Sequence, residues 1–426
     1  MVSFRGDPPM RLCLVASLML LAACGRDLPD EIDEGRVVSD SAGVQLVDNL
    51  GPTRALEVRE ALRFGVVDGD HNLIFDRIRT VAVDSDGSIW VSDSHESIRR
   101  YSREGVYVGS VGGEGEGPGE SPRGYGDIWL SDSTIYAVAY SPPTLQLFSK
   151  DGTYRGQRRA LTPEGVTVVP LGPVRDRWLF VRMHLPEADL PEARDTWVVL
   201  EGSATAADDD SVATVLGTPH VESPYGWSAG SYFDGYPSLA AVVDGFIYSD
   251  QMDYVISRFS TSGTLTAVVR RQVDRIPHPA GLAADIRAGL ESKWSQNGYR
   301  PDDTEQDRQL EAALPDSDPD WLPAIDLLLA TPDGGFWVRR ADQHPEPALR
   351  AVAAGTGLIL RAWLDEWRAD WVFDLFDPDG GYRGTVTLPL EFTPMAVTAS
   401  SVVGSITDAL DVEYVVRFEV MDFTDG

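Results

Sequence analysis

A glycine-rich segment at residues 112–120 concentrates carboxylates within a few positions of the chain. Its sequence, Gly-Gly-Glu-Gly-Glu-Gly-Pro-Gly-Glu, contains Glu114, Glu116 and Glu120 but no lysine. A phosphate-binding loop needs converging backbone N–H groups backed by a lysine or a helix start, so we do not expect a phosphate cradle here. The glycines suit a structural crossover, because they allow backbone angles that other residues avoid. If the loop binds a ligand, its carboxylates would favour a hard cation such as calcium.

The six histidines of the chain do not show the spacing of a metal site. No two of them form an HxH or HxxxH pair, and they stand at His71, His95, His184, His220, His278 and His344. Protein sites for zinc and related metals usually draw on several such ligands at once. We therefore predict no cofactor apart from calcium.

The first 23 residues have the features of an export signal. Arg11 supplies positive charge, and residues 12–23 form an apolar stretch that is shorter than the ~20 apolar residues of a membrane span. The residues Leu21-Ala22-Ala23-Cys24 resemble a bacterial lipobox, in which small residues precede a cysteine at the cleavage site. This resemblance implies that the lipoprotein signal peptide, residues 1–23, is removed and that Cys24 is diacylated.

The lipid on Cys24 would hold the protein to the cell envelope. Gly25 is not the aspartate that retains lipoproteins at an inner membrane, so we expect an outer-membrane location, facing the periplasm or the cell surface. The formal net charge of −31 repels phosphate backbones and disfavours adsorption to anionic lipid. Nucleic acid is therefore not expected as a partner, and the lipid is expected to supply the membrane contact. The acidic residues 24–42 are expected to form a flexible tether.

One short phrase of the sequence occurs twice and indicates the fold. Asp86-Gly87-Ser88-Ile89-Trp90-Val91-Ser92-Asp93 returns, altered, as Asp244-Gly245-Phe246-Ile247-Tyr248-Ser249-Asp250. In each copy an aromatic residue and a second glycine follow at matching spacings, Gly105 in the first and Gly263 in the second. A strand, a tight turn and further strands repeated at this scale are typical of the blades of a β-propeller.

The repeat predicts an all-β domain, a six-bladed β-propeller over residues 43–426. The six blades are expected around residues 78–112, 135–154, 177–202, 244–273, 327–376 and 395–418. A helical insertion is expected at about 279–314 and a further insertion at about 341–370. One of the segments 44–47 and 62–65 should complete the last blade and so close the ring. A seventh blade is the alternative if residues 44–65 form a blade of their own.

The repeated phrase resembles the NHL-type repeat of six-bladed propellers. The glycine-rich loop at 112–120 is similar to one in exported bacterial six-bladed propeller lipoproteins, a TolB-like group. The resemblance covers most of residues 43–426 and implies the fold and export. Some propellers of this type are lyases or calcium-dependent lactonases, whose histidine or asparagine ligands are scarce in this chain.

The loops between the second and third strands of the blades are the predicted recognition surface. In propellers these loops share one face with the crossovers between blades, and that face usually binds the ligand. The candidate ligand-binding residues on it are Asp93, His95, Tyr140, Asp250 and Arg340. The leading hypothesis is a binding or scaffold module for a peptide, a glycan or an envelope protein. The alternative is a cation-dependent hydrolase or lyase with its site at the central channel; no catalytic residue is predicted.

Overall fold

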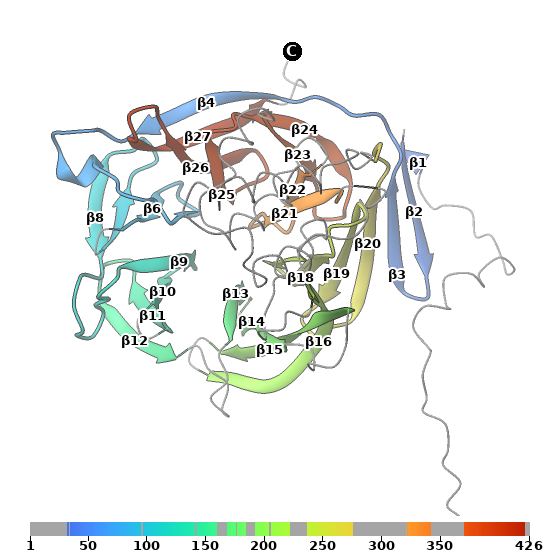
Figure 1. The fold of residues 1–426 in the computed structure, drawn as a ribbon, viewed down its shortest axis with the longest axis horizontal. Coiled ribbons are helices and arrows are strands. Elements are labelled where there is room, and N and C mark those ends of the chain that lie inside the picture. Colours follow the sequence, from blue (N-terminus) through green and yellow to red (C-terminus); the bar gives the residue numbers. More distant parts are fainter. Residues whose placement is uncertain are drawn as a thin grey trace, which may run out of the picture.

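The chain forms a closed ring of six β-sheets, which confirms the predicted six-bladed, all-β propeller (Figure 1). The computed structural model describes residues 32–33, 35–94, 97–140, 143–159, 168–175, 177–184, 192–203, 206–221, 237–275, 321, 323–341 and 370–421. The predicted signal peptide, the whole of the predicted helical insertion at 279–314 and most of the insertion at 341–370 therefore lie outside the described residues.

Blades 1 to 3 follow one another along the chain, each with four antiparallel strands. Blade 1 consists of β5 (Thr80–Val83), β6 (Ile89–Ser92), β7 (Ile98–Tyr101) and β8 (Tyr107–Val111). Blade 2 consists of β9 (Tyr125–Leu130), β10 (Thr134–Tyr140), β11 (Pro143–Ser149) and β12 (Tyr154–Arg159). Blade 3 consists of β13 (Val169–Val174), β14 (Arg177–His184), β15 (Glu192–Ser203) and β16 (Ala206–Val221). A short 3-10 helix, η1 (His71–Leu73), precedes blade 1.

Blades 4 to 6 complete the ring, and the last one borrows a strand from the start of the chain. Blade 4 consists of β17 (Ser238–Val242), β18 (Gly245–Ser249), β19 (Val255–Ser260) and β20 (Leu265–Arg271). Blade 5 consists of β21 (Ile325–Ala330), β22 (Phe336–Arg340), β23 (Trp371–Phe376) and β24 (Tyr382–Leu388). Blade 6 consists of β25 (Phe392–Val397), β26 (Ser401–Thr407), β27 (Glu413–Met421) and β4 (Glu57–Phe64).

The second glycine of each copy of the repeat, Gly105 or Gly263, occupies the turn between the third and fourth strands of its blade. Gly105 and its counterpart Gly263 have φ angles of +80° and +75°, which side chains other than glycine rarely tolerate. Each donates its N–H to a serine carbonyl three residues earlier at 2.9 Å, Ser102 for Gly105 and Ser260 for Gly263. The same φ region and the same bond recur in the corresponding turns of blades 2 and 5, so one turn type serves four blades.

The core of the described residues lies between neighbouring blades. Trp90 and Ile98 of blade 1 pack against Tyr125 and Phe148 of blade 2, and similar apolar clusters separate the other blade pairs. Strands such as β6 and β23 are buried at every position because both of their faces meet another blade. Burying each such large side chain contributes about 1.5–3 kcal/mol, which makes the ring a rigid scaffold.

Strands β2 (Arg36–Ser41), β3 (Val44–Asn49) and β4 form a strap around the outside of blades 4, 5 and 6. Strand β4 pairs with β27, so the predicted closure by residues 62–65 is confirmed and the count is six blades. Strand β3 instead pairs in parallel with β20 of blade 4, and β2 and the short β1 (Ile32–Asp33) extend that sheet. The folded part therefore begins before residue 43, because β2 occupies much of the segment predicted to be a tether.

Asn49, at the end of β3, joins the strap to two blades. Its side chain is buried and donates to the carbonyl oxygens of Arg270 in blade 4 and Gly380 in blade 5, both at 3.1 Å. Its carboxamide oxygen accepts from the N–H of Tyr382 at 2.9 Å. Beyond Asn49 the strap follows blade 5, where the N–H of Leu56 donates to the carbonyl oxygen of Thr385 at 2.8 Å.

A buried ion pair connects blades 4 and 5. Arg271 and Asp374 have side-chain exposures of 1% and 0%, with 3.0 Å between the Arg271 Nε and a carboxylate oxygen. The same carboxylate accepts hydrogen bonds from the hydroxyls of Tyr254, at 2.7 Å, and Thr385. Burial, followed by the negative charge of Asp374, raises the pKa of Tyr254 well above its usual value. Because every oxygen of this carboxylate has a partner, the pair acts as a structural bridge.

Strands outside the predicted blade segments include β9, β13, β16, β17 and β24. Strand β9 precedes a turn without glycine, and β13 contains two prolines, which favour other conformations. The acidic segment 206–210 lies beyond the predicted segment of blade 3, yet β16 already begins at Ala206. The pairing of β16 with the long strand β15 outweighs the low strand propensity of its three consecutive aspartates.

Candidate functional site

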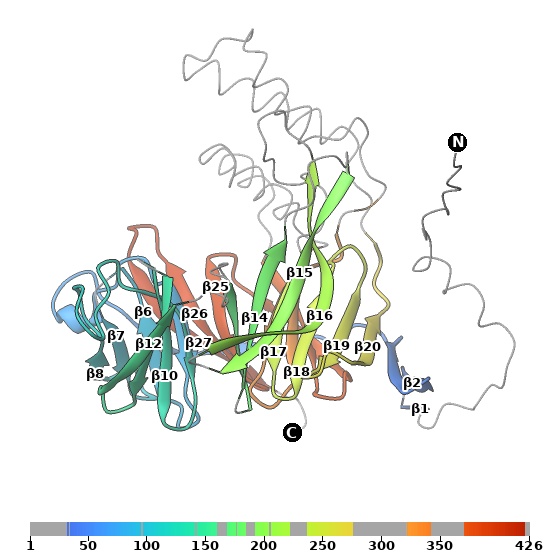
Figure 2. The ribbon, with the colours of Figure 1, turned by 90° about the horizontal axis from the view of Figure 1, so that it is seen from below.

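The two faces of the ring differ in the connections that they carry. Turns between first and second strands and between third and fourth strands are short, and by antiparallel pairing they share one face, here called the turn face. The opposite loop face carries the second-to-third-strand connections and the crossovers between blades. The longest intervals between strands all leave from the loop face: residues 65–79, 112–124, 222–237, 272–324 and 341–370. At this face the ends of β15 and β16 also rise above the ring (Figure 2).

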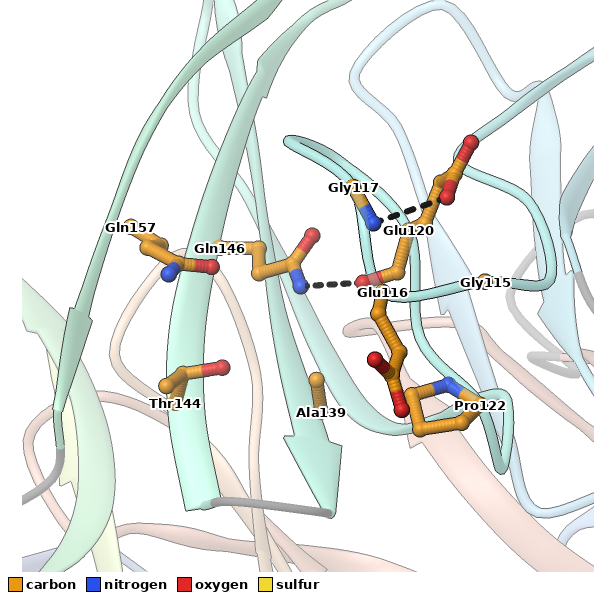
Figure 3. Close-up of a pocket in the computed structure, with 9 residues that line it drawn as sticks. All are labelled: Gly115, Glu116, Gly117, Glu120, Pro122, Ala139, Thr144, Gln146 and Gln157. Atoms are coloured by element: carbon orange, nitrogen blue, oxygen red, sulfur yellow. Dashed lines mark hydrogen bonds between the residues drawn. The ribbon is translucent and has the colours of Figure 1, made fainter.

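A pocket of about 340 Å³ opens at the loop face beside blade 2. We call it the crossover pocket, because the glycine-rich crossover from blade 1 to blade 2 forms one wall and strands β10, β11 and β12 form the other (Figure 3). Its lining residues are Gly115, Glu116, Gly117, Glu120, Pro122, Ala139, Thr144, Gln146 and Gln157. The carboxylates singled out in the sequence thus lie at a cavity, except Glu114, which is not part of the lining.

The register of blade 2 gathers the polar side chains of this pocket on one sheet face. Gln146 lies opposite Gln157, and Thr144 lies two positions from Gln146 on the same strand. On the neighbouring strand β10 the residues opposite Thr144 and Gln146 are Ala139 and a second alanine. Residues that face each other across antiparallel strands project to the same side, so small alanine side chains leave the space that the polar side chains line.

Tyr125 anchors the glycine-rich crossover to blade 2. The buried Tyr125 hydroxyl donates to the carbonyl oxygen of Gly119 at 2.8 Å and accepts from the N–H of Gly113 at 3.4 Å. A hydrogen bond of 2.8 Å from the N–H of Gly117 to the carboxylate of Glu120 and one of 2.8 Å from the N–H of Ser121 to the carbonyl oxygen of Gly113 hold the loop further. The wall of the pocket is therefore preorganised by its own hydrogen bonds.

We expect the substitution Tyr125→Phe to loosen this wall. Losing the hydroxyl leaves the Gly119 carbonyl without that donor, and the free energy of unfolding should fall by about 1–2 kcal/mol in urea titrations. Burial raises the pKa of Tyr125 to about 12 from an ordinary 10.0. The protonated hydroxyl stabilises the fold fully below the unfolded-state pKa, and that contribution is lost as the pH rises toward the folded-state pKa. The difference between the two proteins should accordingly shrink above pH 10.

Tyr154→Phe is the matched control, because the Tyr154 hydroxyl has no hydrogen bond within the described part of the chain. Its ring packs near the same crossover, against Phe148 and close to Gly119. A change within about 0.5 kcal/mol is expected for this variant. Equal losses from both substitutions would show that ring packing, rather than the Tyr125 hydroxyl, holds the crossover.

The pocket presents hydrogen-bond acceptors and negative charge. Glu116 is exposed, and its carboxylate has no hydrogen bond or ion pair within the described residues. Gln146 is 2% exposed, and its amide nitrogen donates to the carbonyl oxygen of Glu120 at 2.8 Å. The amide oxygen of Gln146 is buried and has no partner among the described residues. None of the lining residues is a lysine or an arginine.

The predicted recognition residues that the structure describes lie on several different blades. Asp93 is 0% exposed, and its carboxylate binds Arg99 and the N–H of Asp76, so it supports the loops from below the surface. His95 lies outside the described residues. Tyr140 ends β10, directly after Ala139 of the crossover pocket.

Asp250 and Arg340 lie on the other side of the ring, at blades 4 and 5. Asp250 follows β18 and is half-buried; its charge adds to the burial that raises the pKa of Tyr248 to about 12. Arg340 ends β22, close enough to Tyr254 for its charge to act on that hydroxyl. The contribution of these five residues to binding remains a prediction.

The polar wall of Thr144, Gln146 and Gln157 was missed in the sequence. The sequence signal for this wall was the alternation of polar residues along β11. Only the register of β11 with β10 places these residues beside the glycine-rich loop. The sequence also contains Gly226-Trp227-Ser228-Ala229-Gly230, a Gly-x-Ser-x-Gly phrase outside the described residues. A nucleophile elbow of this type requires the strand-to-helix turn of an α/β-hydrolase, which a propeller does not provide.

No group of three or more histidine, cysteine, aspartate or glutamate side chains within the described ranges could hold a metal ion. No helix in that part of the chain is both long and apolar enough to cross a membrane.

Comparisons with known proteins find similarity to solved structures alone. No protein-family model and no curated protein matches the chain. A member of the DUF4221 family from Bacteroides vulgatus is similar in structure, with a TM-score of 0.46 and 8% identity, over 86% of this chain and 99% of that chain. The WD40 domain of Pan2 from Neurospora crassa has a TM-score of 0.37 and 8% identity, over 86% of this chain and 96% of its own. At this level of similarity, neither assigns a ligand or an activity to this chain.

Proposed function

We propose that this protein is a binding or scaffold module that recognises a peptide or protein partner through the loop face of its propeller. The asymmetry of the ring supports this proposal: the described connections of one face are tight turns, whereas the long intervals of sequence start and end at the other face, which also has the projecting ends of β15 and β16 and the crossover pocket. A rigid ring with such a face supplies a preorganised surface, which lowers the entropy that binding costs. Propellers serve many functions, so the fold alone does not choose the partner.

We further propose that the module is anchored in the cell envelope by a lipid on Cys24. The support is the lipobox-like sequence Leu21-Ala22-Ala23-Cys24 and the acidic residues that follow it. One lipidated cysteine would leave the ring free to turn either face toward a partner, and an outer-membrane location is the proposed one.

Site-specific photo-crosslinking in cells tests both parts of the proposal. A photoreactive amino acid replaces Val67, which follows β4 at the loop face and is 69% exposed, or Val106, which lies in a turn of the opposite face and is 63% exposed. We expect a specific adduct in the membrane fraction from position 67 and none from position 106. Adducts from position 106 alone would contradict recognition by the loop face.

The variant Cys24→Ser is the control for the anchor. It should move the protein from the membrane fraction to the soluble fraction without changing its thermal unfolding. If the Cys24→Ser variant stayed in the membrane fraction, the proposed lipid anchor would be wrong. The crosslinking result would then bear on the loop face alone.

A further inference from the structure

We propose that the crossover pocket binds a cationic side chain, the ammonium group of a lysine or the guanidinium group of an arginine, presented by a peptide or protein partner. This inference rests on the proposed function and specifies the chemistry of one contact on the loop face.

The charge of the pocket selects a cation. Glu116 and Glu120 line it together, and no lysine or arginine does. One oxygen of Glu120 accepts the N–H of Gly117, whereas the carboxylate of Glu116 has no partner among the described residues. The exposed Arg159 ends β12 opposite Thr144 but does not line the cavity. In Figure 3 the carboxylate of Glu120 turns back toward Gly117, whereas that of Glu116 points away from it, so a cationic group would meet the carboxylate of Glu116, and a charge-assisted hydrogen bond to it is of the stronger kind.

Gln146 adds an observation that is independent of the carboxylates. Its side chain extends from β11 into the space between the sheet and the glycine-rich loop (Figure 3). The hydrogen bond from its nitrogen to the Glu120 carbonyl oxygen fixes which end of the amide is the acceptor. The acceptor oxygen is buried and has no donor within the described residues, an arrangement that costs free energy until a donor arrives. An ammonium or guanidinium group consists entirely of such donors.

Other occupants fit this lining less well. Calcium takes six to eight oxygen ligands, and no cluster of three or more candidate side chains occurs in the described ranges. A sugar ring usually stacks on an aromatic side chain, and none of the lining residues is aromatic. The segment of this chain that precedes β2 is itself acidic, so it would be repelled by Glu116 and Glu120.

Nuclear magnetic resonance of the purified, isotope-labelled protein tests the inference with small probes. The probes are acetyl-Gly-Lys-Gly-amide and acetyl-Gly-Arg-Gly-amide, with the citrulline peptide as a neutral match for arginine. We expect a cationic peptide to shift the side-chain amide signals of Gln146 and Gln157 and the backbone signals of Gly115 and Gly117. The citrulline peptide should leave them unchanged at the same concentration.

Two substitutions that each remove one negative charge distinguish binding in the pocket from general attraction to an acidic protein. Glu116→Gln removes a lining carboxylate that has no hydrogen bond or ion pair with the described residues, and it should weaken binding about fivefold. Glu114→Gln makes the same change in the same loop, outside the lining, and binding should stay the same. Gln146→Leu, checked for thermal unfolding, should weaken binding as well, because the acceptor is lost.

Three results would overturn the inference. They are equal binding of the citrulline peptide, equal weakening by Glu114→Gln and Glu116→Gln, and shifts at these signals with calcium chloride or a disaccharide but not with the cationic peptides. Each of these results would leave a specific adduct from position 67 valid. The proposed function is tested separately, by the crosslinking experiment.

Discussion

Replacing Asp374 by alanine is expected to lower the free energy of unfolding by about 3–5 kcal/mol. The substitution leaves the guanidinium of Arg271 buried between blades 4 and 5 without its counter-charge. It also removes the acceptor of the Tyr254 and Thr385 hydroxyls. Urea-induced unfolding followed by tryptophan fluorescence and circular dichroism measures the loss.

Two further variants show whether the buried charge is the cause. Glu419→Ala removes one partner of a surface pair, Arg59 and Glu419, and should cost less than about 1 kcal/mol. The double replacement Asp374→Leu with Arg271→Met should recover much of the loss, because it removes both charges and keeps the volume. If the single variant at Asp374 were no more harmful than the one at Glu419, the bridge would have no structural importance.

Deleting residues 1–65 is expected to abolish the closed ring. The deletion removes β4 from blade 6 and the strap from blades 4 and 5, and it turns β27 into an open edge. An exposed strand edge pairs readily with other chains, so we expect aggregation and loss of a cooperative thermal transition. Size-exclusion chromatography and calorimetry measure the two effects.

Deleting residues 1–34 is the control, because it keeps β2, β3 and β4 intact. This shorter deletion should give a monomer with nearly the thermal stability of the full chain. A soluble, cooperatively unfolding monomer after the longer deletion would mean that the ring is stable without its closing strand.

The parts of the fold that could be predicted are those with local signals. Turn glycines such as Gly105 and Gly263 mark a backbone conformation that few other residues adopt, so their spacing indicated the blades. The closing strand β4 followed from the need to remove open edges. The parallel pairing of β3 with β20 could not be predicted, because it joins distant segments without any local sequence signature.

Only one part of the candidate site, the glycine-rich loop, could be predicted from the sequence. The carboxylates of Glu116 and Glu120 were visible as a cluster in the sequence. Their partner Gln146 was not, because its place beside the loop depends on the register of β11 against β10 and on the hydrogen bond to the Glu120 carbonyl oxygen. The contact between Gln146 and Glu120 spans 26 residues of the chain, and packing decides it without any local sequence signature.

Because β4 and β27 close the ring, the protein can complete its folding only after its last strand has been synthesised. During synthesis β3 and β4 appear first, yet β3 must wait for β20, and Phe64 of β4 must wait for Val415. Contacts of such long sequence separation slow folding, because the entropy of a long loop is lost before the contact forms. Until the last strand is available, a nascent chain therefore presents unpaired strands at both ends, and any factor that protects it must act over nearly its whole length.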